Sequence, residues 1–272
     1  MTNPVVEDIP YRTIEGTELK ARLYRPHPEG PAPFVIDAHG GAWGRGSRLS
    51  NEVIHQDFAK NGIGVFALDF RLSGETQFPA PVIDINYGVR WFKANASALG
   101  VAPSIIGAMG ASSGGNQMGL VALTPDDARY MAPDPSLADV DASIAFFIAC
   151  WSILDPLARY QMAQKVGNER LIAATKAYFP TDEDMETGNP FMVLDRGEAT
   201  HMPPMIIIQG TEDANVEHTR ADIFAERYRA AGGSIDLHKY EGQPHMFILT
   251  EPDTEASKDA IEKLRHFVLA QA

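Results

Sequence analysis

The sequence predicts an α/β protein built on a doubly wound, mostly parallel, eight-stranded sheet. Short apolar runs alternate with helix-compatible segments from residue 34 onward, which favours parallel strands joined by helices. Before them, residues 5–26 alternate in polarity around Gly16, which is typical of an antiparallel hairpin. No repeat or low-complexity linker divides the chain. We therefore expect a single domain over residues 1–272, with its active groups at the carboxyl ends of the strands.

The strands are predicted in chain order from short apolar runs bounded by turn residues. The hairpin is expected at a sheet edge, with Leu19, Ala21 and Leu23 on one face, and a proline-rich turn follows at residues 26–33. The six further strands are expected at residues 34–38, 63–68, 105–110, 143–150, 205–209 and 235–240.

The helices are predicted from apolar residues at helical spacing and from stop signals such as Asn61-Gly62. They are expected at residues 51–60, 81–98, 114–123, 217–231 and 253–269. Residues 124–139 are rich in proline and aspartate, so we expect a loop there. Residues about 152–203 interrupt the strand-helix alternation with helical pieces. We expect this segment to form a lid-like insertion.

Composition narrows the class of protein. Hydrophobic residues make up 44% of the 272 residues and charged residues 22%, as in soluble globular proteins. The formal net charge of −13 disfavours nucleic acid and anionic membranes as partners. No apolar run approaches the roughly 20 residues that span a bilayer, and Met1 to Pro4 lack the features of a signal peptide. The only cysteine, Cys150, cannot form an internal disulfide, which fits a cytoplasmic protein.

One glycine-rich turn carries the strongest chemical signal. Residues 110–114 read Gly-Ala-Ser-Ser-Gly, the G-x-S-x-G turn in which a strand reverses into a helix. A serine at its apex projects its hydroxyl above the sheet, and the flanking positions approach so closely that glycine fits. A flexible Gly-Ser turn is the alternative, and Ser113 is the rival nucleophile. Ser112 has glycine at the required spacing on both sides, so we assign the nucleophile to it.

A serine nucleophile needs a histidine base and a carboxylate that orients it. The strand at 205–209 is followed by Asp213, and the last strand is followed by His245, so both follow the serine in the required order and loops. Glu212 is the rival carboxylate, which we interpret as a solvated loop residue. Apart from His39, the remaining histidines lie in a turn, within helices, within the last strand or before a strand.

Residues 39–43 read His-Gly-Gly-Ala-Trp and follow a buried strand; we call them the oxyanion loop. Two consecutive glycines let backbone N–H groups point at a substrate oxygen without a side chain in the way. With the amide of Ser113, those of Gly40 and Gly41 would form an oxyanion hole. An ordinary tight turn is the alternative, and His39 is better suited to bracing the loop than to proton transfer.

These motifs together resemble the α/β-hydrolase superfamily, within the hormone-sensitive-lipase-like esterases and their neighbours, the small carboxylesterases and kynurenine formamidases. The resemblance covers about residues 17–270 and rests on segments 39–43, 69–72, 78–80, 110–115, 210–213 and on His245. It implies the α/β-hydrolase fold, Ser112 as nucleophile, His245 as base and acid, Asp213 as orienter, and Gly40, Gly41 and Ser113 as oxyanion donors. The lipase-like esterases usually read Gly-Asp-Ser-Ala-Gly-Gly, whereas this chain has Ala111 and Ser113 at the variable positions.

A substrate pocket is expected near strand ends that carry large apolar side chains. The candidates are Trp43, Phe70, Met118, Trp151, Met246 and Phe247. Asp69 and Arg71 are expected to pair near the site, with a bracing role more than a chemical one. No Cys/His cluster has metal-ligand spacing, so we expect no metal, and a serine–histidine–aspartate mechanism requires no cofactor.

The leading hypothesis is hydrolysis of small-to-medium carboxylic esters through an acyl-enzyme. An amidase or formamidase with the same triad is the alternative, and a non-catalytic, ligand-binding hydrolase fold is the third. The expected partner is a small-molecule ester or amide. The last helix and the edge hairpin could also support a homodimer.

Overall fold

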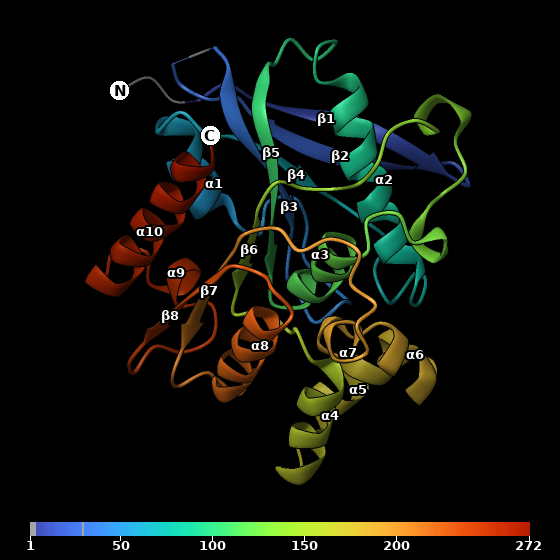
Figure 1. The fold of residues 1–272 in the computed structure, drawn as a ribbon, viewed down its shortest axis with the longest axis vertical. Coiled ribbons are helices and arrows are strands. Elements are labelled where there is room, and N and C mark those ends of the chain that lie inside the picture. The colour runs from blue at the N-terminus through green and yellow to red at the C-terminus, as the bar shows by residue number, and fades with distance from the viewer. Residues whose placement is uncertain (1–3, 29) are drawn as a thin grey trace.

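The computed structural model describes residues 4–28 and 30–272, and its strands form one sheet in the order β1-β2-β4-β3-β5-β6-β7-β8 (Figure 1). The strands are β1 (Val6–Ile14), β2 (Thr17–Tyr24), β3 (Ala32–Ala38), β4 (Gly64–Leu68), β5 (Pro103–Ala111), β6 (Phe147–Cys150), β7 (Met205–Gly210) and β8 (Ile235–Tyr240). The β1–β2 and β2–β4 pairs are antiparallel and the others are parallel. The predicted sheet and its edge hairpin are thus confirmed.

Helices cover both faces of this sheet (Figure 1). They are α1 (Glu52–Lys60), α2 (Ala80–Asn95), α3 (Ser113–Leu123), α4 (Pro156–Lys165), α5 (Glu169–Tyr178), α6 (Asp182–Thr187), α7 (Pro190–Asp195), α8 (Thr219–Ala230), α9 (Phe247–Thr250) and α10 (Glu255–Gln271). Successive residues of β3 point to opposite faces: Phe34 packs in the core under α2, α3 and α8, and Val35 in the core under α1 and α10. Burial on both faces explains why the strands read as continuous apolar runs.

The structure corrects three details of the predicted elements. Strand β6 spans only Phe147–Cys150, because Asp141 closes a turn on Ser143 and the parallel ladders begin at Phe147. The expected loop at 124–139 contains two short 3₁₀ turns, Ala128–Tyr130 and Pro135–Leu137. The short helix α9 was not predicted.

Helices α4 to α7 lie between β6 and β7 in the chain and form a separate group beyond the ends of the strands (Figure 1). Asp155 anchors their start: it caps α4 by accepting from the Ala158 amide at 3.0 Å and pairs with Arg220 of α8. The side-chain amide of Asn189, which caps α7, donates to Asp155 at 2.9 Å. The helical segment is therefore joined to the sheet domain by polar side chains as well as by the chain itself.

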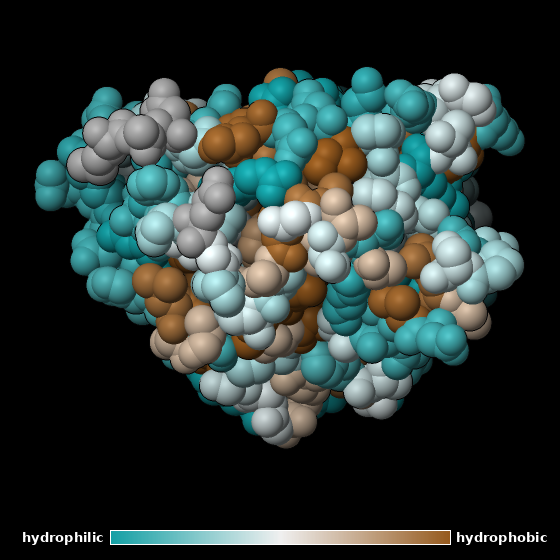
Figure 2. Space-filling model, turned by 90° about the horizontal axis from the view of Figure 1, so that it is seen from above, coloured by the Kyte–Doolittle hydropathy of each residue, from teal (hydrophilic) through white to brown (hydrophobic). Residues whose placement is uncertain are grey.

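Cys150 ends β6 and is completely buried. Burial raises the pKa of its thiol well above the usual range. Seen from above in Figure 2, hydrophilic residues cover most of the surface and hydrophobic ones lie in small groups. Within the described ranges, no helix has the length and apolar character needed to cross a bilayer. Residues 1–3, which enter the expectation about a signal peptide, lie outside the described residues.

Candidate active site

The turn at Ser112 has the backbone conformation that the motif requires. Strand β5 ends at Ala111, α3 begins at Ser113, and Ser112 between them has φ 51° and ψ −119°. A Cβ on Gly114 would lie 2.1 Å from the carbonyl oxygen of Ala38, and one on Gly110 would lie 2.6 Å from the Cα of Gly115. Both flanking positions therefore exclude any side chain, which leaves the serine at the apex of a sharp strand-to-helix turn.

Ser112, His245 and Asp213 form one hydrogen-bonded row. His245 Nε2 lies 3.0 Å from the Ser112 hydroxyl oxygen, and His245 Nδ1 lies 2.7 Å from Asp213 Oδ2. Because a carboxylate only accepts, Nδ1 donates to Asp213, and Nε2 is left to accept from the serine hydroxyl. The structure brings together the three residues that the sequence singled out. Glu212 is exposed instead.

Asp213 is held as an anion by several donors. Its side chain is inaccessible to solvent, and it accepts from the Gln209 side chain at 2.9 Å and from the amides of Asn215 and Val216 at 2.8 Å each. Burial by itself would raise the pKa of Asp213, but the hydrogen bonds, with His245 first, hold that pKa below its usual value. A negative charge behind His245 orients the ring and stabilises its protonated form.

The oxyanion loop lies against the turn at Ser112. Gly41 has φ 134°, and a Cβ there would lie 1.9 Å from the carbonyl oxygen of Arg45, so only glycine fits. A Cβ on Gly40 would lie 3.0 Å from the Cβ of Ser112. The amide of Ser113 is in the first turn of α3, where N–H groups have no partner within the helix. Gly40 and Ser113 thus lie next to Ser112, and Gly41 lines the same cavity as Ser112.

His39 braces this loop, as its position suggested. Its Nδ1 donates to the carbonyl of Gly40 at 2.8 Å, and its ring stacks on Phe70 with the ring centres 4.3 Å apart. Burial lowers the pKa of His39 despite that hydrogen bond, so the imidazole stays neutral. A neutral, stacked ring fixes the backbone of the loop without adding a charge near the serine.

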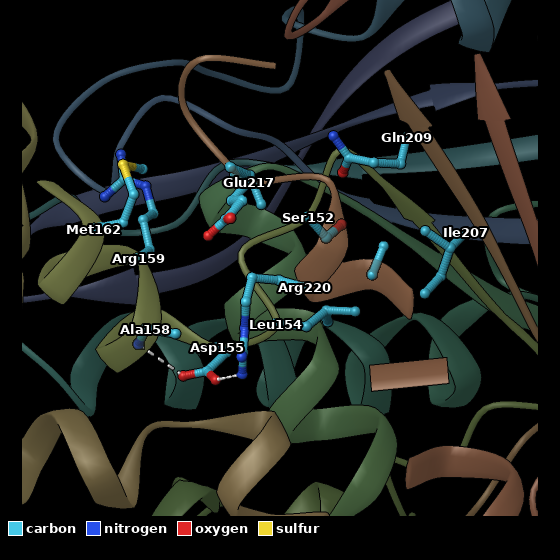
Figure 3. Close-up of a pocket in the computed structure, with 12 residues that line it drawn as sticks. Ser152, Leu154, Asp155, Ala158, Arg159, Met162, Ile207, Gln209, Glu217 and Arg220 are labelled. Atoms are coloured by element: carbon cyan, nitrogen blue, oxygen red, sulfur yellow. Dashed lines mark hydrogen bonds and ion pairs between the residues drawn. The ribbon is translucent and has the colours of Figure 1, made fainter. Parts of the chain in front are cut away.

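Arg159 of α4 connects the helical segment to the loop that carries Asp213. Its guanidinium donates to the Asn215 side chain at 2.6 Å and to the Thr175 hydroxyl of α5 at 3.2 Å, and it lies over the Trp43 ring, 5.4 Å from the ring centre. Burial lowers the pKa of Arg159 to about 10, which leaves it charged at neutral pH. Figure 3 shows it on the same small pocket as Asp155 and Arg220.

A cavity of about 470 Å³ opens beside the serine. Ser112, His245 and the loop glycines line one part of it, and Trp151 and Met246, two of the predicted pocket residues, line another. The helical segment contributes Arg170, Leu171 and Ala174 from α5. No sequence pattern pointed to these α5 residues, because an isolated helix pattern does not reveal which face meets a distant loop.

Three predicted pocket residues lie in the core instead. Trp43 stacks on Tyr178, with its ring centre 5.1 Å away. Phe70 stacks on His39, and Phe247 packs against Trp151 and Tyr240. None of the three lines the cavity, and each is at most 4% exposed. Met118, a further candidate, is also fully buried. These aromatic side chains turn inward because burial of their large apolar area is favourable.

Asp69 and Arg71 do not pair with each other. Asp69 accepts from the backbone amide of Arg48 at 2.7 Å and pairs with its guanidinium. Arg71 binds the fully buried Asp84 at 2.8 Å. Both residues are structural braces, with partners other than the expected ones. Among the described residues, no group of three or more His, Cys, Asp or Glu side chains is arranged to hold a metal ion.

The strand order, the strained serine turn and the Ser–His–Asp row define the α/β-hydrolase class. Within that class, the chain belongs to the BD-FAE family, whose sequence profile matches residues 22–228.

Individual relatives share only about a quarter of their aligned residues with this chain. The chain is 26% identical over 236 residues to the esterase LipC and 27% identical over 205 residues to the probable carboxylic ester hydrolase LipM, both of Mycobacterium tuberculosis. These matches cover 82% and 74% of this chain but 55% and 46% of the relatives, so it spans about half the length of the curated relatives it matches.

A solved structure matches over nearly the whole chain. This is Est2, a thermophilic esterase of Thermogutta terrifontis with propionate bound. Its TM-score is 0.79 at 26% sequence identity, and the match covers 97% of this chain and 94% of Est2. The similarity therefore includes the helical segment as well as the sheet.

Proposed function

We propose that this protein hydrolyses carboxylic esters of small to medium size through an acyl-enzyme intermediate. The observation that carries the proposal is the hydrogen-bonded row of Ser112, His245 and Asp213 at the wall of a cavity large enough for a small substrate.

In the first half-reaction, Ser112 Oγ attacks the carbonyl carbon of the ester while His245 Nε2 takes the hydroxyl proton. Asp213 stabilises the resulting imidazolium. When the tetrahedral intermediate collapses, the C–O bond to the alcohol breaks and His245 gives its proton to the leaving oxygen. A water molecule, deprotonated by His245, then attacks the acyl group and releases the carboxylic acid and Ser112.

The amides of Gly40, Gly41 and Ser113 are proposed to hold the negative oxygen of each tetrahedral intermediate. They belong to backbone segments at the Ser112 end of the cavity, so they need little reorganisation when charge develops. Loss of one such donor costs roughly a hundredfold or more in the rate of acyl transfer in other enzymes. The proposed donors are therefore a large part of the catalytic effect.

The relatives support an ester as the substrate. LipM carries the name of a carboxylic ester hydrolase, and Est2 is an esterase that bound propionate, a short-chain acid. A short acyl chain also fits the cavity volume of about 470 Å³. These likenesses favour ester over amide hydrolysis.

We also propose that residues about 152–203 act as a lid on one hydrolase domain. Helix α5 of this segment contributes part of the cavity wall. Displacement of α5 would widen the entrance to Ser112 without disturbing the sheet. The segment would then control access and product release.

Labelling with a fluorophosphonate tests the nucleophile directly. Intact-mass analysis and peptide mapping are expected to show one adduct, on Ser112, that forms much more slowly in His245→Ala. Turnover of 4-nitrophenyl acetate and butyrate is expected to vanish in Ser112→Ala. It is expected to persist in the control variant Ser136→Ala, because Ser136 is an exposed serine in a 3₁₀ turn outside the site. An adduct on Ser113, or full turnover by Ser112→Ala, would overturn the assignment.

A further inference from the structure

Two arginines on the cavity are without a partner in the described chain. Arg45 and Arg170 both line the cavity beside Ser112. Both residues are exposed, and neither guanidinium forms a hydrogen bond or ion pair with another described residue. Every other arginine donates to a carboxylate, a carbonyl or another side-chain oxygen. The two exceptions share one cavity, although the sequence has 36 acidic and only 23 basic residues.

The cavity wall provides nothing to neutralise these charges. Its lining residues in the described structure include no aspartate or glutamate. The nearest catalytic carboxylate, Asp213, does not line the cavity and is engaged by His245, Gln209 and two backbone amides. A concave site with charges of one sign concentrates ligands of the opposite sign. The cavity is thus positive within a protein whose net charge is −13.

The two arginines come from different parts of the fold. Arg45 follows the oxyanion loop and packs on it, since a Cβ at Gly41 would lie 1.9 Å from the Arg45 carbonyl oxygen and 3.1 Å from its Cγ. Arg170 is in the first turn of α5, whose Leu171 and Ala174 also line the cavity. A ligand bound covalently to Ser112 would therefore have cations available both from the sheet domain and from the helical segment.

We propose that the cavity selects esters that carry a carboxylate in addition to the ester group, and that Arg45 and Arg170 bind this carboxylate. Guanidinium groups suit this task because they pair with a carboxylate through two parallel hydrogen bonds. The inference rests on the proposed esterase activity and narrows its substrates to anionic esters. Half-esters of dicarboxylic acids, and phenolic or hydroxy acids acylated on their hydroxyl group, belong to this class.

Matched ester pairs test the selection. On the acyl side, 4-nitrophenyl hemiadipate is compared with the neutral 4-nitrophenyl 6-oxoheptanoate; on the alcohol side, 4-acetoxybenzoate is compared with 4-acetoxybenzamide. After subtraction of the uncatalysed rate, kcat/KM is expected to favour the charged member of one pair by at least about tenfold. The favoured pair identifies the side on which the arginines lie. High ionic strength is expected to reduce the preference.

Variants connect the preference to the two residues. In Arg45→Gln/Arg170→Gln, the ratio of charged to neutral kcat/KM is expected to fall toward one, mainly through a higher KM for the charged ester. Arg129→Gln removes one positive charge, as each single substitution does, from an arginine outside the cavity, and it is expected to keep the wild-type ratio. A wild-type ratio near one in both pairs, or a ratio that the double variant leaves unchanged, would overturn the proposal.

The two proposals can fail separately. Ser112-dependent turnover of neutral esters without any preference for charged ones would refute anion selection and leave the esterase proposal standing. If no ester were turned over, the esterase proposal would fail, and calorimetric titration of adipate into Ser112→Ala would decide the binding question. Binding that disappears when Arg45→Gln and Arg170→Gln are added supports the carboxylate site, and no binding refutes it.

Discussion

The amide nitrogen of Trp43 lies 3.1 Å from the hydroxyl oxygen of Ser113, so the oxyanion loop is hydrogen-bonded to the residue that follows Ser112. Trp43 has φ 60°, a conformation that non-glycine residues rarely adopt. The lipase-like esterases usually have alanine where this chain has Ser113. Here the Ser113 hydroxyl accepts a hydrogen bond from the buried Trp43 amide. This bond fixes the glycines of the oxyanion loop relative to Ser112.

Ser113→Ala tests this connection. Removal of the hydroxyl leaves the Trp43 amide without its acceptor, which is expected to lower the free energy of unfolding by about 1–3 kcal/mol. It is also expected to lower kcat several-fold with little change in KM, because the loop donors act mainly on the transition state. Ester kinetics and thermal unfolding measure both effects. A wild-type kcat would mean that the hydrogen bond does not position the loop.

Ser112→Gly is expected to be more stable than Ser112→Ala, although both are inactive. At φ 51° an alanine is as strained as the serine, whereas glycine adopts this conformation freely. After allowance for the greater freedom of glycine in the unfolded chain, the difference is expected to be about 1 kcal/mol in the free energy of unfolding. Denaturant unfolding of the two variants measures it. If alanine were the more stable, the turn would not be strained.

Arg159→Gln is expected to impair catalysis from a distance. It removes the cation that contacts the Trp43 ring and shortens the side chain that reaches Asn215 and Thr175. We expect kcat to fall roughly tenfold, with partial recovery in Arg159→Lys, which keeps the charge. Ester kinetics measure kcat and KM separately, and thermal unfolding measures stability. A lower kcat in the folded enzyme, with little change in KM, indicates that Arg159 positions the catalytic residues. A lower free energy of unfolding together with an unchanged kcat would assign Arg159 a purely structural role.

The lowered pKa of Asp213 makes the free energy of unfolding depend on pH. Its pKa in the folded protein lies below the ordinary value, because the hydrogen bonds from His245 and the loop outweigh the effect of burial. Such a group stabilises the fold fully above its unfolded pKa of about 3.9 and loses this contribution as pH falls through the folded pKa. The stability difference between wild type and Asp213→Asn is therefore expected to shrink in acid below about pH 4. A difference that stays constant from pH 7 to pH 3 would contradict this.

Local patterns predicted the positions of Ser112, Asp213 and His245 because each of these residues lies in the turn or loop that follows a strand, and parallel strands end at one edge of the sheet. Glycine at 110 and 114 was equally informative, since close backbone approach admits no other residue. In both cases the sequence signal arises from constraints that act within a few residues.

The cavity wall was harder to predict because it depends on contacts between distant segments. Aromatic residues at strand ends were expected to face a substrate, but Trp43 and Phe70 found buried partners in Tyr178 and His39. Arg170 carried no local signal, since α5 could have met the sheet domain by any face. Arg45, two residues after the oxyanion loop, was the one cavity arginine that its position could have indicated.

The burial of Cys150 has a practical consequence for spectroscopy. The chain has no other cysteine, and this thiol is inaccessible and disfavoured as a thiolate, so the native protein offers no site to maleimide dyes. A cysteine introduced at Val166, which caps the C-terminus of α4 and is 64% exposed, would become the only reactive thiol. A fluorophore or spin label there would report movement of the helical segment in an otherwise unlabelled molecule.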